Sequence, residues 1–266
     1  MDQNRVLNEF YNSREEDSRL VQDKAHKIEF IITTKYIDKY LKPGMKILEV
    51  GAGTGRYSLH YANKGYEVKA VELIEHNINI FKKHITSNMN IEVIQGNALD
   101  LSMYNDEEFD MVLNLGPLYH LAETKDMDKA INESIRVCKT DGILYFAMLS
   151  NESNFVNEVM KNKLYLLSNE FDKETFDLVD IPFVFLRINE MNDLFKNKNI
   201  EKLHMVGQDG LSQTFKNQIN DFTDEEYNMW IKYIEKSCED ESIIGYSNHV
   251  LFIGKNSKKI ALSQIY

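Results

Sequence analysis

Short apolar runs alternate with amphipathic stretches through the middle of the chain. The apolar runs have the length and composition of buried strands, and the amphipathic stretches have the apolar repeat of helices. In order from residue 46 the segments are KILEVG, TGRYSLHYANKG, EVKAVEL, IEHNINIFKKHI, IEVIQGN, FDMVLNLG, DMDKAINESIRVCKTDG and ILYFAML. This alternation over about 105 residues predicts a parallel sheet covered by helices on both faces.

The first 42 residues have a helical pattern instead. Ile28, Ile32, Tyr36 and Tyr40 recur four residues apart, which gives one face of a helix. The KPG at 42–44 ends that helix, because proline and glycine do not continue it.

Two stretches interrupt the alternation later in the chain. Residues 150–187 are rich in Phe, Leu and Tyr without strand–helix alternation until PFVFLRI, and residues 208–247 contain a capping box formed by Thr223 and Glu226. Between them, a helix at about 189–197 and the strand IEKLHMVG are expected, and the strand HVLFIGK closes the chain. We predict one α/β domain over 1–266, with an N-terminal helical segment at 1–43, a core at 44–149, and insertions at 150–187 and 208–247 that cover the substrate side.

The composition is that of an ordinary soluble globular protein, with 43% hydrophobic and 27% charged residues. The longest apolar run, ILYFAML, is far short of the ~20 residues that a membrane-spanning helix needs. No signal peptide is expected at the charged N-terminus, and Cys138 and Cys238 have no metal-site spacing, so we expect reduced thiols and a cytoplasmic protein. The net charge of −11 and the lack of a long basic stripe disfavour nucleic acid as a partner.

A glycine-rich turn follows the first strand, in KILEVGAGTGRYS. The dinucleotide fingerprint G-x-G-x-x-G fails by one residue, because Gly51 and Gly53 are followed by Gly55 and position 56 is Arg. A phosphate-binding P-loop fails too, since no Gly-Lys-Ser/Thr follows. The turn still bends the chain sharply and lets the backbone approach a ligand. Glu49, two residues before the turn, can brace it through backbone amides or pair with an ammonium group of the ligand.

Polar groups end the next three strands, at the edge where a doubly wound sheet binds its ligand. Glu72 ends the second strand, and its carboxylate can accept both hydroxyls of a ribose. Asn97 and the backbone around Ala98 and Leu99 can bond the edge of an adenine, and NLGPLYHL at 114–121 places a Gly-Pro turn at the crevice mouth. An adenosine fits these groups and a pyrophosphate does not, so we predict S-adenosylmethionine as the ligand.

The segments ILEVGAGTGRYS, VKAVEL, IQGNALD and FDMVLNLGPLYHL resemble the class I S-adenosylmethionine-dependent methyltransferases over residues 44–150. The LGPLYHL motif is similar to that of a bacterial subgroup of uncertain substrate. The resemblance implies a Rossmann-like sheet of seven strands in the order 3-2-1-4-5-7-6, with strand 7 antiparallel, and an N-terminal helical lid. Many relatives carry Asp where this chain has Asn97, so its adenine contact would use a neutral acceptor. Motifs and resemblance together give the expected cofactor-binding residues Glu49, Gly51, Ala52, Gly53, Glu72, Leu73, Asn97, Ala98, Leu99, Asn114 and Leu115.

Few residues are candidates for the chemistry. A base is needed only when the methyl acceptor arrives protonated. Tyr119 and His120 are the catalytic candidates, since one can orient the acceptor and His120 can remove its proton; alternatively, PLYHL caps a short helix. Tyr11, Glu16 and Arg19 lie in the N-terminal segment. The resemblance implies that this segment folds over the cofactor as a lid, where Tyr11 or Arg19 can reach the methionine carboxylate; the alternative is a solvated amphipathic helix. The histidines show no metal-ligand spacing, so no metal is expected.

The sequence thus predicts an enzyme that transfers the methyl group of S-adenosylmethionine to an O, N or C atom of a small molecule and releases S-adenosylhomocysteine. One alternative is methylation of a protein or a nucleic acid. Enzymes acting on nucleic-acid amines are expected to carry [DN]PP[YF] after the fourth strand, where this chain has Asn114-Leu-Gly-Pro-Leu-Tyr. The other alternative is a non-catalytic protein that binds an adenosine ligand. The acceptor and the oligomeric state stay open.

Overall fold

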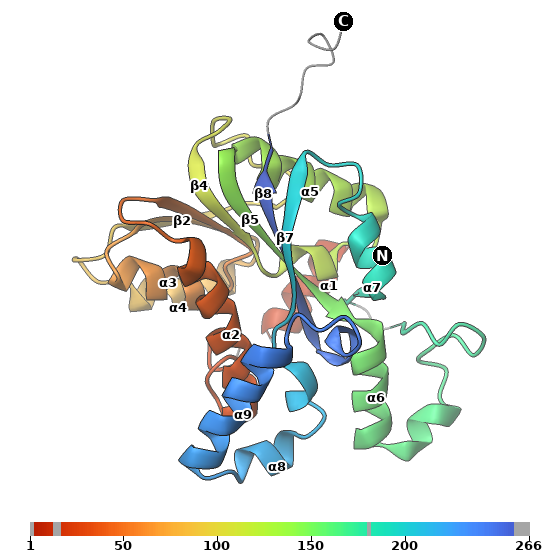
Figure 1. Ribbon diagram of the computed structural model, residues 1–266. Helices are drawn as coiled ribbons and strands as arrows, with labels where there is room; N and C mark the ends of the chain where they lie inside the picture. The colour runs from red at the N-terminus through yellow and green to blue at the C-terminus, as the bar shows by residue number, and fades with distance from the viewer. Residues whose placement is uncertain (1–2, 13–16, 180–181, 258–266) are drawn as a thin grey trace, which may run out of the picture.

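The computed structural model describes residues 3–12, 17–179 and 182–257. In this part of the chain, eight strands form one sheet with helices packed on both of its faces (Figure 1). The strands are β1 (Lys46–Val50), β2 (Glu67–Glu72), β3 (Ile91–Gln95), β4 (Phe109–Asn114), β5 (Cys138–Ser150), β6 (Phe185–Leu186), β7 (Ile200–Gly207) and β8 (His249–Asn256).

The strand order is β3-β2-β1-β4-β5-β8-β7. The pairs from β3 to β5 are parallel, whereas β8 is antiparallel to both β5 and β7. When the short β6 is left out, β7 and β8 are the sixth and seventh strands along the chain. The predicted order 3-2-1-4-5-7-6 with an antiparallel final strand is therefore confirmed. The predicted number of strands is corrected from seven to eight, since β6 pairs in parallel with Leu149 and Ser150 at the end of β5. Two residues carry no periodicity from which this strand could be predicted.

Nine α-helices and four short 3₁₀ helices are present in the described residues. The α-helices are α1 (Gln3–Asn12), α2 (Lys24–Tyr40), α3 (Arg56–Asn63), α4 (Glu75–His84), α5 (Thr124–Val137), α6 (Asn151–Lys161), α7 (Ile188–Asp193), α8 (Lys216–Asn220) and α9 (Asp224–Ser237). The 3₁₀ helices are η1 (Pro117–His120), η2 (Lys163–Leu167), η3 (Gly210–Ser212) and η4 (Ile244–Tyr246). None of the described helices is long and apolar enough to cross a bilayer.

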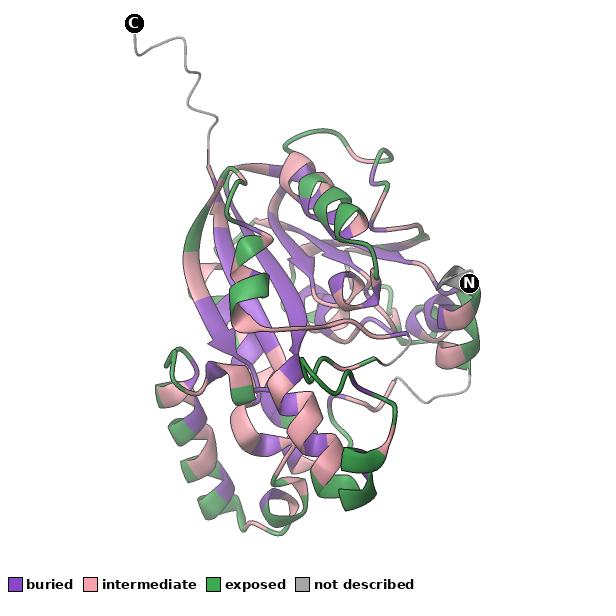
Figure 2. Ribbon diagram, turned by 90° about the vertical axis from the view of Figure 1, so that its right-hand side faces the viewer, coloured by how far each residue is buried: buried purple, intermediate pink, exposed green. Residues whose placement is uncertain are grey.

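The sheet separates two main apolar clusters, because successive residues of a strand point to opposite faces. Ile47 and Tyr145 pack on one side with residues of α2, α3 and α9. Leu48 and Leu144 pack on the other side with residues of α5 and α7. Figure 2 shows the central strands as the most continuously buried part of the chain. The predicted covering of both faces is thus confirmed.

The segments outside the alternating core are mostly helical. The predicted N-terminal helix corresponds to α2, which starts at the Asp23 N-cap and ends at Tyr40, before the KPG. The predicted capping box opens α9, where the Thr223 amide donates to Glu226 Oε2 at 2.7 Å. The helix predicted at about 189–197 is shorter, because α7 ends at Asp193 and the chain continues in turns.

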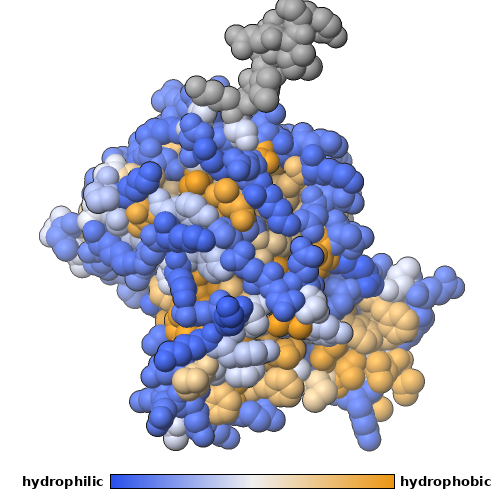
Figure 3. Space-filling view, viewed as in Figure 1, coloured by the Kyte–Doolittle hydropathy of each residue, from blue (hydrophilic) through white to orange (hydrophobic). Residues whose placement is uncertain are grey.

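The stretch between β5 and β6 carries an exposed apolar surface around α6 and η2 (Figure 3). In the same stretch the buried Tyr165 and Phe171 pack with the half-buried Phe155 in a small aromatic cluster. Phe176 stacks on that cluster but is 48% exposed. The exposed apolar residues of this stretch are Met160, Leu164, Leu166, Leu167, Phe176 and Val179.

Candidate functional site

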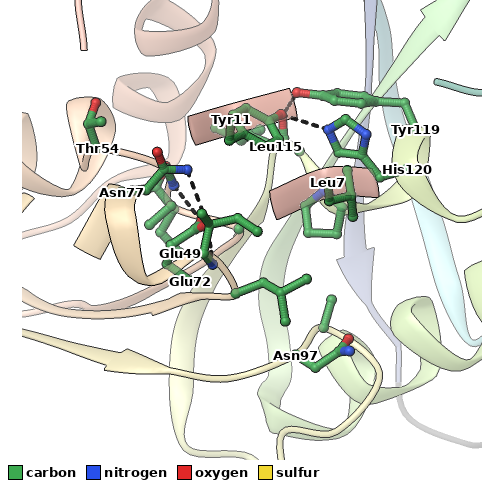
Figure 4. A pocket seen from close by; sticks show the side chains of 18 of the residues that line it. Leu7, Tyr11, Glu49, Thr54, Glu72, Asn77, Asn97, Leu115, Tyr119 and His120 are labelled. Carbon is green, nitrogen blue, oxygen red and sulfur yellow. Dashed lines mark hydrogen bonds between the residues drawn. The ribbon is translucent and has the colours of Figure 1, made fainter. Parts of the chain in front are cut away.

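One cavity contains nearly all of the residues that the sequence singled out. It lies at the carboxyl ends of β1, β2 and β4, next to α1, and holds about 1200 Å³ of space, counting the part open to solvent. The predicted residues in its wall are Tyr11, Arg19, Glu49, Gly51, Ala52, Gly53, Glu72, Leu73, Asn97, Ala98, Leu99, Leu115, Tyr119 and His120 (Figure 4).

Asn114 is the predicted residue that the structure does not bring into the cavity wall. It ends β4 and is completely buried, and its Nδ2 donates to Ser134 Oγ on α5 at 3.3 Å. The side chain therefore points into the layer between sheet and helix, because the alternation along β4 directs position 114 to that face. Glu16, the other residue proposed for the N-terminal segment, lies outside the described residues.

The glycine-rich turn gives the cavity a wall of backbone. Gly51 has φ of +71°, and a Cβ atom there would lie 2.6 Å from Pro117 Cδ. Gly53 has φ of +55°, but a Cβ atom there would meet no heavy atom within 4 Å. The amides of Gly51 and Ala52 both donate to the Val71 carbonyl, at 2.8 and 3.1 Å. The turn is thus fixed to the end of β2 while the backbone around Gly53 stays open to a ligand.

Glu72 is held by backbone amides at the end of β2. Its Oε2 accepts from the Gly53 amide at 2.7 Å and its Oε1 from the Ile74 amide at 2.9 Å. A carboxylate oxygen has more than one acceptor position, so both oxygens keep capacity for the two hydroxyls of a ribose. Burial raises the pKa of Glu72, and the amide hydrogen bonds oppose that rise.

Asn77 on α4 is a cavity residue that the sequence analysis missed. Its Nδ2 points to Glu72 Oε1 at 3.4 Å, while its buried Oδ1 has no hydrogen-bond partner among the described residues. A buried acceptor without a partner costs about 1–3 kcal/mol, and a ribose hydroxyl would supply the missing donor. The Asn77 side chain therefore fits a nucleoside beside Glu72. Asn77 comes five positions after Glu72, and no motif links the two.

Glu49 braces α3 rather than the amides of the glycine turn. Its Oε2 accepts from the Ser58 amide at 2.8 Å and from the Ser58 hydroxyl. Burial raises the pKa of this carboxyl to about 8. The cavity wall includes Glu49, so a cationic group of a ligand can reach it.

Asn97 closes a tight turn after β3. Its Oδ1 accepts from the Leu99 amide at 2.9 Å, an arrangement typical of asparagine in turns. The Leu99 amide is therefore engaged. The Ala98 amide has no acceptor among the described residues and is the backbone donor left to meet an adenine edge.

His120 and Tyr11 form a hydrogen-bonded pair from two distant parts of the sequence. His120 Nδ1 lies 3.1 Å from the Pro182 carbonyl, and its Nε2 lies 2.7 Å from the Tyr11 hydroxyl (Figure 4). A carbonyl only accepts, so Nδ1 carries the proton of the neutral ring and Tyr11 donates to Nε2. Burial lowers the pKa of His120 to about 4. The neighbouring Tyr119 hydroxyl donates to the Leu115 carbonyl at 3.2 Å.

Arg19 reaches the cavity wall while its guanidinium holds Glu29 of α2, with N–O distances of 2.9 and 3.4 Å. His249 Nδ1 lies 3.3 Å from Glu29 Oε2 and 3.0 Å from Asp209 Oδ2. Glu29, Asp209 and His249 are close enough to share a metal ion. Two carboxylates beside an arginine and a histidine with a raised pKa, however, already form a charge-balanced ion-pair network.

Comparison with known proteins finds methyltransferases. Residues 48–146 match a family described as a methyltransferase domain. The candidate methyltransferase YqeM of Bacillus subtilis strain 168 is 29% identical over 44% of this chain and 48% of its own length, so the chain matches about half of that relative. The ubiquinone biosynthesis O-methyltransferase of Bartonella tribocorum is 26% identical over 71% of both chains.

The fold is also that of solved methyltransferase structures. A protein of Methanosarcina mazei described as a S-adenosylmethionine-dependent methyltransferase superposes with a TM-score of 0.56 and 20% identity, over 84% of this chain and 97% of that one. Residues 48–146 are thus similar to the methyltransferase-domain family, and the chain has the fold of solved S-adenosylmethionine-dependent methyltransferases.

Proposed function

We propose that this protein transfers the methyl group of S-adenosylmethionine to a small-molecule acceptor and releases S-adenosylhomocysteine. One observation supports this most strongly. A single cavity has a nucleoside end, formed by Glu72 and Asn77, and an end with a proton acceptor, His120. A methyltransferase needs these two functions side by side, because the donor and the acceptor must meet in line.

The chain's own residues would divide the work of binding. Glu72 and Asn77 would hold the ribose hydroxyls, the Ala98 amide and Asn97 the adenine edge, and the backbone at Gly53 the amino-acid part. When bound, S-adenosylmethionine supplies a methyl group already activated by its positive sulfur. The protein therefore has to orient the acceptor, exclude water and accept a proton where the acceptor carries one.

Burial of the acceptor end supports a small molecule over a macromolecule. His120 is 7% exposed and Leu7 is 6% exposed, and Leu7 and Tyr11 of α1 lie in the wall beside it. A protein or RNA segment would have to displace this helix to reach His120. The net charge of −11 also disfavours nucleic acid electrostatically.

Two measurements test the proposal. Calorimetry should show binding of S-adenosylmethionine and S-adenosylhomocysteine but no binding of NAD. Tritiated S-adenosylmethionine should then label products in a low-molecular-weight metabolite extract, and not in matched protein or RNA fractions. Labelling confined to protein or RNA would favour the corresponding alternative. Tight cofactor binding with no labelled product in any fraction would favour the non-catalytic binder.

A further inference from the structure

The contact between Tyr11 and His120 suggests a more specific chemistry than acceptor orientation. Tyr11 comes from α1 and His120 from η1, 109 residues later, and they meet in the cavity wall at 2.7 Å. Aromatic rings pack around the pair: Tyr119 and Phe183 lie 4.9 and 5.0 Å from the His120 ring, centre to centre. Phe10 packs edge-on against both Tyr11 and Phe183. The pair is thus held by side chains of three segments.

The direction of the hydrogen bonds gives the pair a defined polarity. The Pro182 carbonyl fixes the proton of the neutral ring on Nδ1, so Nε2 accepts from Tyr11. Since the Tyr11 proton is directed at His120, the Tyr11 oxygen can accept a hydrogen bond from a ligand in the cavity. The group that it can best receive is a hydroxyl that still carries its proton.

We propose, on the basis of the methyltransferase function proposed above, that Tyr11 is a catalytic proton relay between His120 and a hydroxyl acceptor, which makes the protein an O-methyltransferase. The acceptor oxygen forms a bond to the methyl carbon while the carbon–sulfur bond breaks, and that electron pair remains on sulfur. The acceptor proton moves to the Tyr11 oxygen as the Tyr11 proton moves to His120 Nε2. The imidazolium later returns its proton to solvent.

The charge balance of this step suits a buried site. Before transfer the positive charge is on the sulfur of the methyl donor and His120 is neutral; afterwards the sulfur is neutral and His120 carries the charge. The cavity therefore keeps the same net charge, which avoids the cost of creating a new buried charge.

The same geometry disfavours the other acceptor classes. An amine is mostly protonated at neutral pH, and a buried histidine with a pKa of about 4 is far too weak a base to deprotonate it. A carboxylate needs no base, and it would face the lone pairs of Tyr11. A hydroxyl stays neutral until the new bond forms and becomes strongly acidic only then, so a weak base suffices.

The test compares wild type with Tyr11→Phe, His120→Asn and the control Tyr233→Phe, a tyrosine that is 48% exposed. The probes are tritiated S-adenosylmethionine with phenol, catechol and 4-hydroxybenzoate, with benzylamine and thiophenol as amine and thiol counterparts, and a metabolite extract. We expect label on hydroxylated compounds, a fall in kcat of about 10²-fold or more in both site variants, and wild-type turnover in Tyr233→Phe. The Kd for S-adenosylmethionine should stay within threefold of wild type in all variants.

Two further readouts separate a relay from a structural role. In ¹⁵N NMR, His120 should carry its proton on Nδ1, and Tyr11→Phe should shift the Nε2 resonance without changing the tautomer. In mixtures of H₂O and D₂O, kcat of wild type should fall along a curve, because two protons move together.

Three results would overturn the relay. They are a Tyr11→Phe variant with wild-type turnover, label only on amines, thiols or carbon, and a His120 proton on Nε2. By contrast, failure to bind S-adenosylmethionine, or to label any compound of the extract, would overturn the proposed function itself.

Discussion

Substitution of Glu72 by Gln tests the nucleoside end of the cavity with the least change in shape. In the wild type one carboxylate oxygen accepts from the Gly53 amide and the other from the Ile74 amide. A Gln side chain keeps one oxygen and replaces the other by an NH₂ group. One of these two backbone donors would therefore face another donor, and one of two ribose hydroxyls would lose its charged acceptor.

The structure gives the size of the expected effect. A hydrogen bond to a charged group contributes about 1.5–3 kcal/mol, so loss of one ribose bond should weaken binding by about 2 kcal/mol, or about 30-fold in Kd. The effect on stability should be smaller. The backbone donor without an acceptor destabilises the fold, but removal of a buried carboxylate with a raised pKa offsets part of that loss.

The assay is calorimetric titration of S-adenosylmethionine, with thermal unfolding of the same samples. Glu75→Gln is the matched control, because Glu75 is exposed in the first turn of α4, three residues away. We expect wild-type affinity for the control. If Glu72→Gln binds S-adenosylmethionine within twofold of wild type while it remains folded, Glu72 does not contact the ribose and the nucleoside has been placed wrongly.

Three further substitutions test a buried carboxyl, a glycine turn and a helix cap. Glu49→Gln should remove a pH dependence of the stability. Folding raises the pKa of the wild-type carboxyl from 4.5 to about 8, so the protonated carboxyl stabilises the fold fully below pH 4.5. This stabilisation is lost by up to about 1.4 kcal/mol per pH unit as the pH rises to about 8. Urea unfolding without cofactor at pH 6 and 8 should therefore show a smaller difference in the variant; an equal difference would assign the titration elsewhere. Gly55→Ala should lower the free energy of unfolding by about 2–4 kcal/mol, because its Cβ would lie 2.3 Å from the Phe81 ring at a φ of +87°. The control Gly65→Ala has a φ of +88° but open space around its Cβ, so it should show the backbone cost alone. Equal losses of stability in the two variants would contradict the clash. Thr223→Ala should cost about 1 kcal/mol in thermal or urea unfolding through the lost cap of α9, with unchanged cofactor affinity; no loss would show that the cap contributes little.

The sheet could be predicted from the sequence because the core strands are short, mostly apolar runs that alternate with amphipathic helical stretches. The glycine turn and Glu72 could be located as well, since both follow directly from strand ends. The orientation of the Asn114 side chain could not be predicted, because a residue at a strand end can face either the cavity or the helix layer, and sequence position alone does not decide between them.

Contacts between distant segments could not be predicted in the same way. Tyr11 was expected to reach the methionine carboxylate, whereas the structure places its hydroxyl on His120, and Arg19 is paired with Glu29. The Pro182 carbonyl that orients His120 belongs to the long stretch between β5 and β6, which has no periodic pattern. These partners depend on how three segments pack against one another, which no local pattern encodes.

The two-residue strand β6 fixes the end of the preceding stretch to the sheet. The chain leaves β5 after Ser150 and returns beside it, where Phe185 pairs with Leu149. The Val184 amide also donates to the Tyr119 carbonyl at 2.8 Å, which ties the returning end to η1. Since these anchors hold the position of Pro182, a change in the length of the chain between α6 and residue 179 should have little entropic cost. This part of the fold is therefore a natural place to graft a new substrate-facing element while the histidine keeps its orientation.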